Sequence, residues 1–278
     1  MDLLLPLARQ WVAGNTFEEG LQRARVANGR GLGAILNFLG EHYTRREDVE
    51  ATLEEYRAIL SGIDDDGLDA TISVKPTQFG LTIDEAYCRT NLEEIRELCR
   101  AQGVFLWFDM EDTPYTSATL RIYEDTRRAY PEAGVALQAN LHRAEEDLRA
   151  MMPHGIVRLV KGAYREDPGI SYRQKADIDA NYRALMRILF EEGRRFALAT
   201  HDDAMIRDGL ALQEEHQRDL EFQTLMGVRD PLKQELRGRG LRTLEYIPYG
   251  PRWFAYFTRR LRERPRNVIL MMRSFVSP

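Results

Sequence analysis

The stretch RLVKGAYRED, residues 158–167, places two cations where a buried strand should end. Arg158 stands between two apolar residues, and because strand side chains alternate between faces, it points opposite to both. Lys161 follows at the tip of the strand, just before a Gly-Ala-Tyr turn. Fixed cations in such a place can bind an anionic ligand or stabilise negative charge that develops in a reaction. The plain structural alternative for Arg158 is a salt bridge to Asp109 or Glu111 at the same end of the sheet.

A second basic segment, FAYFTRRLRERPRN, covers residues 254–267, and its apolar residues recur at helical spacing. Arg259 and Arg260 are adjacent in it. Two neighbouring guanidinium groups form a receptor for a carboxylate or a phosphate. A solvated basic helix, or a helix that contacts a partner or a membrane surface, is the alternative interpretation.

Eight short runs rich in β-branched and aromatic residues must position these groups, and charged stretches of helical periodicity follow them. Alternating strands and helices predict a parallel sheet. Eight units without a break in composition predict a distorted (βα)8 TIM barrel, with residues 1–32 as a helical extension and 1–278 as one catalytic domain. An open doubly wound sheet is disfavoured because GRGLG (29–33) precedes a strand, with the wrong spacing for a dinucleotide fingerprint. The expected strands are 33–40, 70–76, 103–111, 134–140, 155–162, 195–200, 220–227 and 241–250.

Barrel enzymes carry their active sites at the C-terminal ends of the strands, so the last residues of each run are the candidate site. A single polar residue at a strand end is usually only solvated. Nearly every run ends in such residues, and together they favour a functional rim. The rim residues are Asn37, Glu41, Lys75, Gln78, Asp109, Met110, Glu111, Gln138, Asn140, Arg158, Lys161, Tyr164, Thr200, His201, Asp202, Gln223, Tyr246 and Tyr249.

Composition narrows the class of protein. The chain has 278 residues and a net charge of -5, which argues against a general nucleic-acid binder. No apolar run reaches the length of a membrane-spanning helix, and MDLLLPLA lacks the features of a signal peptide. Cys88 and Cys99 fall on one predicted helix, about 16 Å apart, too far for a disulfide. Two free thiols predict a reducing, cytoplasmic compartment.

Several of these motifs resemble the catalytic domain of FAD-dependent proline dehydrogenases. The matching blocks are SVKPTQFGL, LWFDME, RLVKGAYRE, ATHD, LEFQTLMGV and YFTRRLRERPRN, in the expected order, over roughly residues 33–267. The resemblance implies a barrel that holds FAD, oxidises L-proline to Δ1-pyrroline-5-carboxylate in proline catabolism and passes electrons to a membrane quinone. A peripheral contact at the inner face of the membrane would accompany that last step. The chain leaves no residues for the aldehyde dehydrogenase domain of bifunctional members, so we expect the monofunctional bacterial form.

The resemblance also implies roles for individual residues. Asp109 and Arg158 match catalytic positions, with Arg158 beside flavin N5. The family has Gln-Ala-Tyr where this chain has QAN, so Asn140 replaces an aromatic residue near the flavin. The implied substrate-binding residues are Lys75, Tyr164, Leu225, Tyr246, Arg259 and Arg260. The implied FAD-binding residues are Met110, Gln138, Arg158, Lys161, Gly162, Ala163, Thr200 and His201.

This chemistry is consistent with the residue types. Arg158 and Lys161 at the flavin would stabilise the negative charge of its reduced form. Asp109 would be weakened as a base for the amine proton if it pairs with an arginine, so the proton acceptor stays open. A barrel aldolase that forms a Schiff base through Lys75 or Lys161 is the alternative function. No metal site is predicted, because HDD (201–203) offers ligands but the other histidines, at positions 42, 142, 154 and 216, do not fall at matching strand ends.

Overall fold

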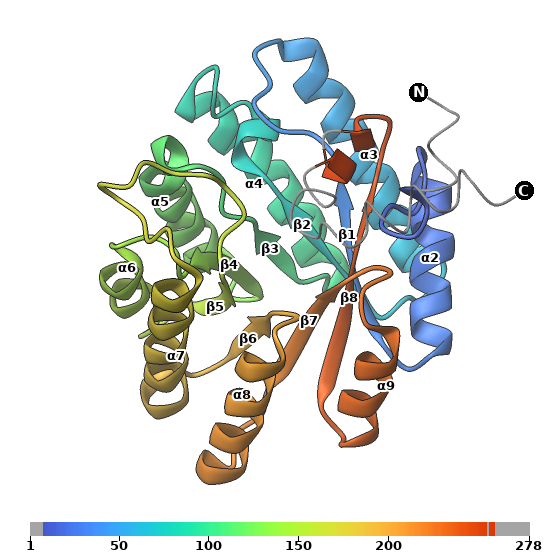
Figure 1. Ribbon diagram of the computed structural model, residues 1–278. Helices are drawn as coiled ribbons and strands as arrows, with labels where there is room; N and C mark the ends of the chain where they lie inside the picture. Colours follow the sequence, from blue (N-terminus) through green and yellow to red (C-terminus); the bar gives the residue numbers. More distant parts are fainter. Residues whose placement is uncertain (1–7, 255, 259–278) are drawn as a thin grey trace, which may run out of the picture.

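The computed structural model describes residues 8–254 and 256–258. In this part of the chain, eight parallel strands close into one barrel with the helices around it (Figure 1). The strand order follows the sequence, and β1 closes the barrel by pairing with β8, with Ile35 opposite Tyr246. The predicted (βα)8 TIM barrel is confirmed. Its strands are β1 (Gly33–Phe38), β2 (Ala70–Val74), β3 (Leu106–Phe108), β4 (Ala133–Gln138), β5 (Ile156–Val160), β6 (Phe196–Ala199), β7 (Glu221–Leu225) and β8 (Arg242–Tyr249).

The outer faces of the strands pack against amphipathic helices. Glycine or aspartate often marks the helix ends: Asp84 accepts a hydrogen bond from the backbone of Tyr87 at the start of α4, and Gly103 ends it in the left-handed conformation. In the predicted N-terminal extension, α2 packs against β1 and β8. The helices are α2 (Phe17–Gly29), α3 (Arg46–Asp65), η2 (Pro76–Phe79), α4 (Glu85–Gln102), α5 (Thr113–Ala129), α6 (Ala144–Met151), α7 (Lys175–Glu192), α8 (Asp203–His216) and α9 (Asp230–Gly238).

The inside of the barrel is filled by its own layer of apolar side chains. Trp107 is its largest member and is 2% exposed. Gly134 on the next strand has no side chain, and a Cβ there would lie 2.4 Å from the Trp107 ring, so this glycine makes room for the indole. The other members of the layer are Ile35, Phe105, Ala197 and Leu244. The layer closes the barrel below the strand ends and gives any site above it a rigid floor.

Two further predictions are tested by the fold. Cys88 and Cys99 are buried free thiols on α4, as expected. The predicted strand 103–111 is wrong in length, because β3 covers only Leu106–Phe108. Three apolar neighbours of β3, Val104, Phe105 and Met110, are buried although they lie outside the strand, and burial alone does not distinguish a loop from a strand.

Candidate active site

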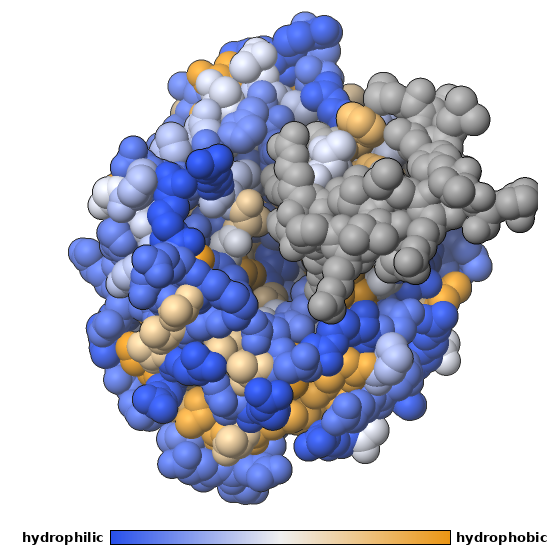
Figure 2. Space-filling model, viewed as in Figure 1, coloured by the Kyte–Doolittle hydropathy of each residue, from blue (hydrophilic) through white to orange (hydrophobic). Residues whose placement is uncertain are grey.

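A cavity of about 570 Å³ opens at the C-terminal ends of the strands. Figure 2 shows this face of the molecule hollowed near its centre. All the described residues for which the resemblance implies a catalytic, substrate-binding or FAD-binding role line the cavity, whereas Arg259 and Arg260 lie outside the described residues. The predicted residues found there are Lys75, Asp109, Met110, Gln138, Arg158, Lys161, Gly162, Ala163, Tyr164, Thr200, His201, Leu225 and Tyr246.

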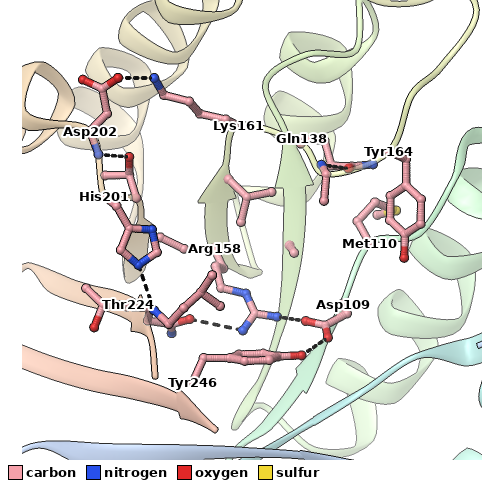
Figure 3. A pocket seen from close by; sticks show the side chains of 18 of the residues that line it. Asp109, Met110, Gln138, Arg158, Lys161, Tyr164, His201, Asp202, Thr224 and Tyr246 are labelled. Atoms are coloured by element: carbon pink, nitrogen blue, oxygen red, sulfur yellow. Dashed lines mark hydrogen bonds and ion pairs between the residues drawn. The ribbon is translucent and has the colours of Figure 1, made fainter. Parts of the chain in front are cut away.

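Arg158 lies at the bottom of the cavity and is 3% exposed. It points into the barrel, as the alternation of β5 predicted. Its guanidinium pairs with Asp109 (Figure 3). It also donates to Ser73 Oγ at 3.1 Å and to Gln223 Oε1 at 3.1 Å. Its Cζ lies 4.8 Å from the Trp107 ring centroid. The salt bridge to Asp109 that we considered as the plain alternative is therefore present, and the same bond fixes the arginine at the cavity floor.

Asp109 joins three strands through its carboxylate. Besides Arg158 on β5, it accepts hydrogen bonds from Ser73 Oγ at 2.8 Å on β2 and from the Tyr246 hydroxyl at 2.6 Å on β8. Burial, followed by the charge of Asp109, raises the pKa of Tyr246 well above its usual value. Tyr246 is therefore a neutral hydrogen-bond donor, and the floor carries one fixed cation beside one fixed anion.

Lys75 forms a side wall of the cavity. It directly follows β2 and is buried, and its Nζ lies 2.8 Å from Glu41 Oε2. The Tyr164 hydroxyl donates to the same Glu41 oxygen at 3.0 Å. The predicted substrate residues Lys75 and Tyr164 are thus brought together by a shared carboxylate.

The chain leaves β5 through a tight turn at Gly162, whose φ is 110°. A Cβ at this position would lie 2.0 Å from Asn140 Oδ1. Ala163 N donates to Gln138 Oε1 at 3.3 Å, so the turn is tied to the end of β4. Asn140 does not line the cavity: it is buried beneath this turn, and its Oδ1 has no partner among the described residues.

We expect Gly162→Ala to lower the free energy of unfolding by about 2 kcal/mol, from backbone strain and overlap with Asn140. Urea unfolding measures the change. Gly67→Ala is the matched control. Gly67 also has a positive φ, but a Cβ added there would have nothing within 4 Å, so only backbone strain is expected to lower its stability. Adding Asn140→Ala should restore the part due to overlap. Equal losses for Gly162→Ala and Gly67→Ala would contradict this account.

Lys161 lines the cavity at its mouth. Its side chain points away from Arg158, toward the N-terminal ends of α7 and α8 (Figure 3). It pairs with Asp179 on α7 and with Asp202, 2.8 Å away at the N-cap of α8. Lys175 pairs with the same two aspartates. The strand ends at Val160, so the backbone turns before Lys161, and the lysine becomes a cation of the cavity mouth rather than of its floor.

The four charges at the mouth are strongly coupled. Burial alone would raise the pKa of Asp202, but hydrogen bonds from Lys161 and Lys175 outweigh it and hold this pKa far below the usual range. The pKa of Asp179 is lowered in the same way. The aspartates are therefore ionised at neutral pH and hold both ammonium groups at the rim.

His201 and Thr200 are held by the backbone of neighbouring segments. His201 Nε2 accepts a hydrogen bond from Leu225 N at 2.9 Å, so the ring proton of a neutral His201 is on Nδ1. Thr200 Oγ1 accepts from Asp202 N at 3.2 Å. These contacts set the orientation of both side chains at the end of β6.

Six rim residues do not line the cavity: Asn37, Glu41, Gln78, Glu111, Asn140 and Tyr249. Asn37 and Gln78 donate to the backbone carbonyls of Ser73 and Phe38, at 2.9 and 3.0 Å. Glu111 follows the short β3 and turns behind the rim, where it accepts from Thr77 N at 3.0 Å and bonds the Thr77 hydroxyl. A residue just past a strand end is placed by the loop geometry, which the strand period does not determine.

Burial raises the pKa of Glu111 to about 7, against the opposing effects of Lys75 and Thr77. Between about pH 4 and pH 7, Glu111 is therefore protonated in the folded state and ionised in the unfolded state. The stability of the fold falls as pH rises through this window. We expect Glu111 to remove on the order of 3 kcal/mol of stability above that window.

Glu111→Gln, whose amide can still bond Thr77 N and the Thr77 hydroxyl, should abolish this fall. Urea unfolding at about pH 5 and about pH 8 measures it. Glu235→Gln on the surface of α9 is the control and should keep the pH dependence of the unchanged chain. An unaltered dependence in Glu111→Gln would contradict the assignment.

Several residues in the cavity or bonded to its floor had no role predicted from the sequence. Ser73 is two residues before Lys75 on β2, so the strand period could have found it. Lys175 and Tyr256 come from helical segments and carry no such signal. Asp202 and Gln223 were predicted at the rim without a role. The cavity residues that the sequence did not point to are Ala136, Val160, Lys175, Ala199, Thr224 and Tyr256.

Comparison with known proteins gives a consistent answer. Residues 20–269 match the family model described as proline dehydrogenase. Proline dehydrogenase 1 of Bacillus subtilis is 34% identical over 275 residues, which cover 97% of this chain and 90% of the relative. Proline dehydrogenase of Deinococcus radiodurans is 30% identical over 281 residues, with the same coverage.

A solved structure supports the fold. The crystal structure of proline utilization A from Bdellovibrio bacteriovorus, inactivated by N-propargylglycine, superposes with a TM-score of 0.85 at 23% identity. The match covers 94% of this chain, which spans about a third (33%) of that longer protein. The matched family model and the relatives of similar length confirm the predicted class of oxidoreductase, and this chain belongs to the proline dehydrogenase family.

Proposed function

We propose that this chain oxidises L-proline to Δ1-pyrroline-5-carboxylate, with FAD held in the cavity above Arg158. The observation that carries the proposal is the fixed floor of the cavity, where Arg158, Asp109 and Tyr246 are bonded to one another at the strand ends. The proposal treats residues 1–278 as one catalytic domain, with 1–32 as its extension.

The donor set of the cavity fits FAD. A flavin needs polar groups along one edge of its ring and cations for its pyrophosphate. Gln138 and the backbone at Ala163 supply the first beside Arg158, and Lys161 and Lys175 supply the second at the mouth. Met110, Gly162, Thr200 and His201 complete the surface that we assign to the cofactor. When bound, FAD supplies the acceptor for the two electrons and the hydrogen that leave the proline ring.

The substrate is proposed to lie between the floor and the Lys75 wall. Lys75 provides a cation for the carboxylate of proline, and Tyr164, Tyr246 and Leu225 provide walls for its ring. Arg259 and Arg260 belong to the same proposal through the family resemblance and lie outside the described residues. These contacts would hold the ring carbon next to the nitrogen in a fixed position. Such positioning is the main contribution that a protein makes to this kind of reaction.

Arg158 and Asp109 have separate parts in this proposal. Arg158 provides a permanent positive charge at the floor, where negative charge grows as electrons leave proline. Asp109 holds this cation and Tyr246 in place. Its oxygens already accept from Arg158, Tyr246 and Ser73, which makes it a poor acceptor for the amine proton. We therefore propose Asp109 as an anchor and assign the proton to no residue.

The aldolase alternative is disfavoured by the surroundings of both lysines. A lysine that forms a Schiff base needs an apolar pocket or a neighbouring cation that favours its neutral form. Lys75 instead lies against Glu41, and Lys161 lies against Asp179 and Asp202. The carboxylates contribute to anion binding only by positioning the ammonium groups of the two lysines.

We further propose a quinone as the electron acceptor, reached by a peripheral contact with a membrane surface. The family resemblance supports this step. In the part of the chain that the structure describes, no helix combines the length and apolar character needed to cross a membrane.

An absorption spectrum of the purified chain, recorded without oxygen before and after L-proline is added, tests the proposal. Flavin bands that bleach with L-proline and persist with D-proline are expected. Flavin bands that persist with both would exclude proline as the substrate. A colourless chain that FAD cannot reconstitute would exclude the cofactor.

A further inference from the structure

One carboxylate at the opposite end of the barrel is bonded to the cavity floor through a single side chain. Glu221 begins β7 and Gln223 is two residues further along, so both face the inside of the barrel. Gln223 Nε2 donates to Glu221 Oε1 at 2.6 Å. The other end of the same amide, Oε1, accepts from Arg158 Nη1 at 3.1 Å. Two hydrogen bonds through the buried Gln223 side chain therefore link Glu221 to Arg158.

The chemistry of the amide makes this link directional. Gln223 has one donor end and one acceptor end, and Glu221 Oε1 accepts from the donor end. The carboxylate therefore turns the NH2 group of Gln223 toward itself and the oxygen toward Arg158. If the amide turned over, its NH2 group would face the guanidinium, and two donors would be opposed with no acceptor between them. Gln223 is 3% exposed, so water cannot easily replace the lost bond.

The surroundings of Glu221 keep it in place. It borders a separate groove at the N-terminal end of the barrel, and the positive charges of Arg195 and Arg242 act on it there. Both arginines have other partners: Arg195 pairs with Glu132 at 2.9 Å, and Arg242 pairs with Asp69. Glu221 has Gln223 as its hydrogen-bond donor among the described side chains. Its position is thus explained by the amide that it holds rather than by a salt bridge of its own.

We propose that Glu221 is a positioning residue for the reaction, which fixes the Gln223 amide and, through it, the guanidinium of Arg158. This inference rests on the proposed function, because it assigns Arg158 to the reacting end of the cavity. It predicts that a change at Glu221, on the far side of the Trp107 layer, alters the rate of flavin reduction while proline binding is kept.

The test uses the full chain with FAD bound and follows reduction by L-proline in an anaerobic stopped-flow instrument. Glu221→Gln has the same shape but allows both orientations of Gln223. We expect it to slow the limiting rate of reduction about ten-fold, with the proline concentration for half-maximal rate changed by less than about two-fold. Glu132→Gln is the control: it removes a carboxylate that faces Arg195 at the same end of the barrel but does not touch Gln223. It should reduce at the rate of the unchanged chain.

A double-mutant cycle separates this role from general stabilisation of the fold. Gln223→Met should by itself slow reduction by a similar factor, and adding Glu221→Gln to it should cost no more than about two-fold. The proposal would be overturned if Glu221→Gln slowed reduction by the same factor in the Gln223→Met variant as in the unchanged chain. A Glu221→Gln rate equal to that of Glu132→Gln would also overturn it. Melting temperature and FAD per chain are measured alongside. If Glu221→Gln does not fold, an unchanged rate in Gln223→Met overturns the proposal.

The outcome is distinguishable from a failure of the proposed function. An unchanged chain that L-proline does not reduce would overturn the proposed function and the positioning role with it. An unchanged chain that is reduced normally, beside a Glu221→Gln variant that is reduced equally fast, would overturn the positioning role alone.

Discussion

Replacing Arg158 by Met is expected to slow reduction of the bound flavin by L-proline about 10²- to 10³-fold, while FAD stays bound. Arg158 is the cation at the cavity floor, where negative charge develops, and it is fixed there by Asp109, Ser73 and Gln223. A preorganised charge in a buried site stabilises a transition state far more than one in water. Stopped-flow absorbance of the flavin bands gives the rate, and a proline titration gives the affinity.

Two variants make this result specific to the position of the charge. Arg158→Lys keeps the charge but cannot reach three acceptors with a planar fork, so an intermediate rate is expected. Arg149→Met removes an exposed arginine on α6 that pairs with Glu145 at 2.9 Å, outside the barrel, and it should leave the rate unchanged. A rate in Arg158→Met within about three-fold of the unchanged chain would contradict its place at the reacting end.

The sequence predicted the barrel well because strand period and helix period alternate along the whole chain, and a parallel barrel needs little else. The rule that strand ends form the site also worked where a residue lies within its strand. Arg158 and Tyr246 are such cases, since the two-residue period alone turns them into the barrel. That same period could have identified Ser73 and Glu221, which lie two residues from Lys75 and Gln223.

Prediction was weakest one to three residues past a strand end. Lys161, Glu111 and Asn140 all follow a strand, and the turn that comes next decides where each one points. Lys161 turns to Asp179 and Asp202, which come from two different helices and have no sequence relation to it. Partners of this kind depend on how the helices pack around the barrel, and that packing is not encoded in any local pattern.

Replacing Asp109 by Ala is expected to lower kcat/KM for proline about 10²-fold and the free energy of unfolding by about 3 kcal/mol. The change removes the anion that pairs with Arg158, and it also removes the acceptor for Tyr246 and Ser73. The guanidinium is left buried without its counter-charge, which is the costly way to break such a pair. Tyr246→Phe removes only one of these bonds and should cost several-fold less in rate.

Because Asp109 acts by holding Arg158, Asp109→Ala should cost much less in rate when Arg158 is already Met. Steady-state kinetics and urea unfolding of the two single variants and the double variant measure both effects. Independent, multiplying losses in the double variant would show instead that Asp109 has a part in the reaction that does not pass through Arg158, and the base for the amine proton would then be sought at this carboxylate.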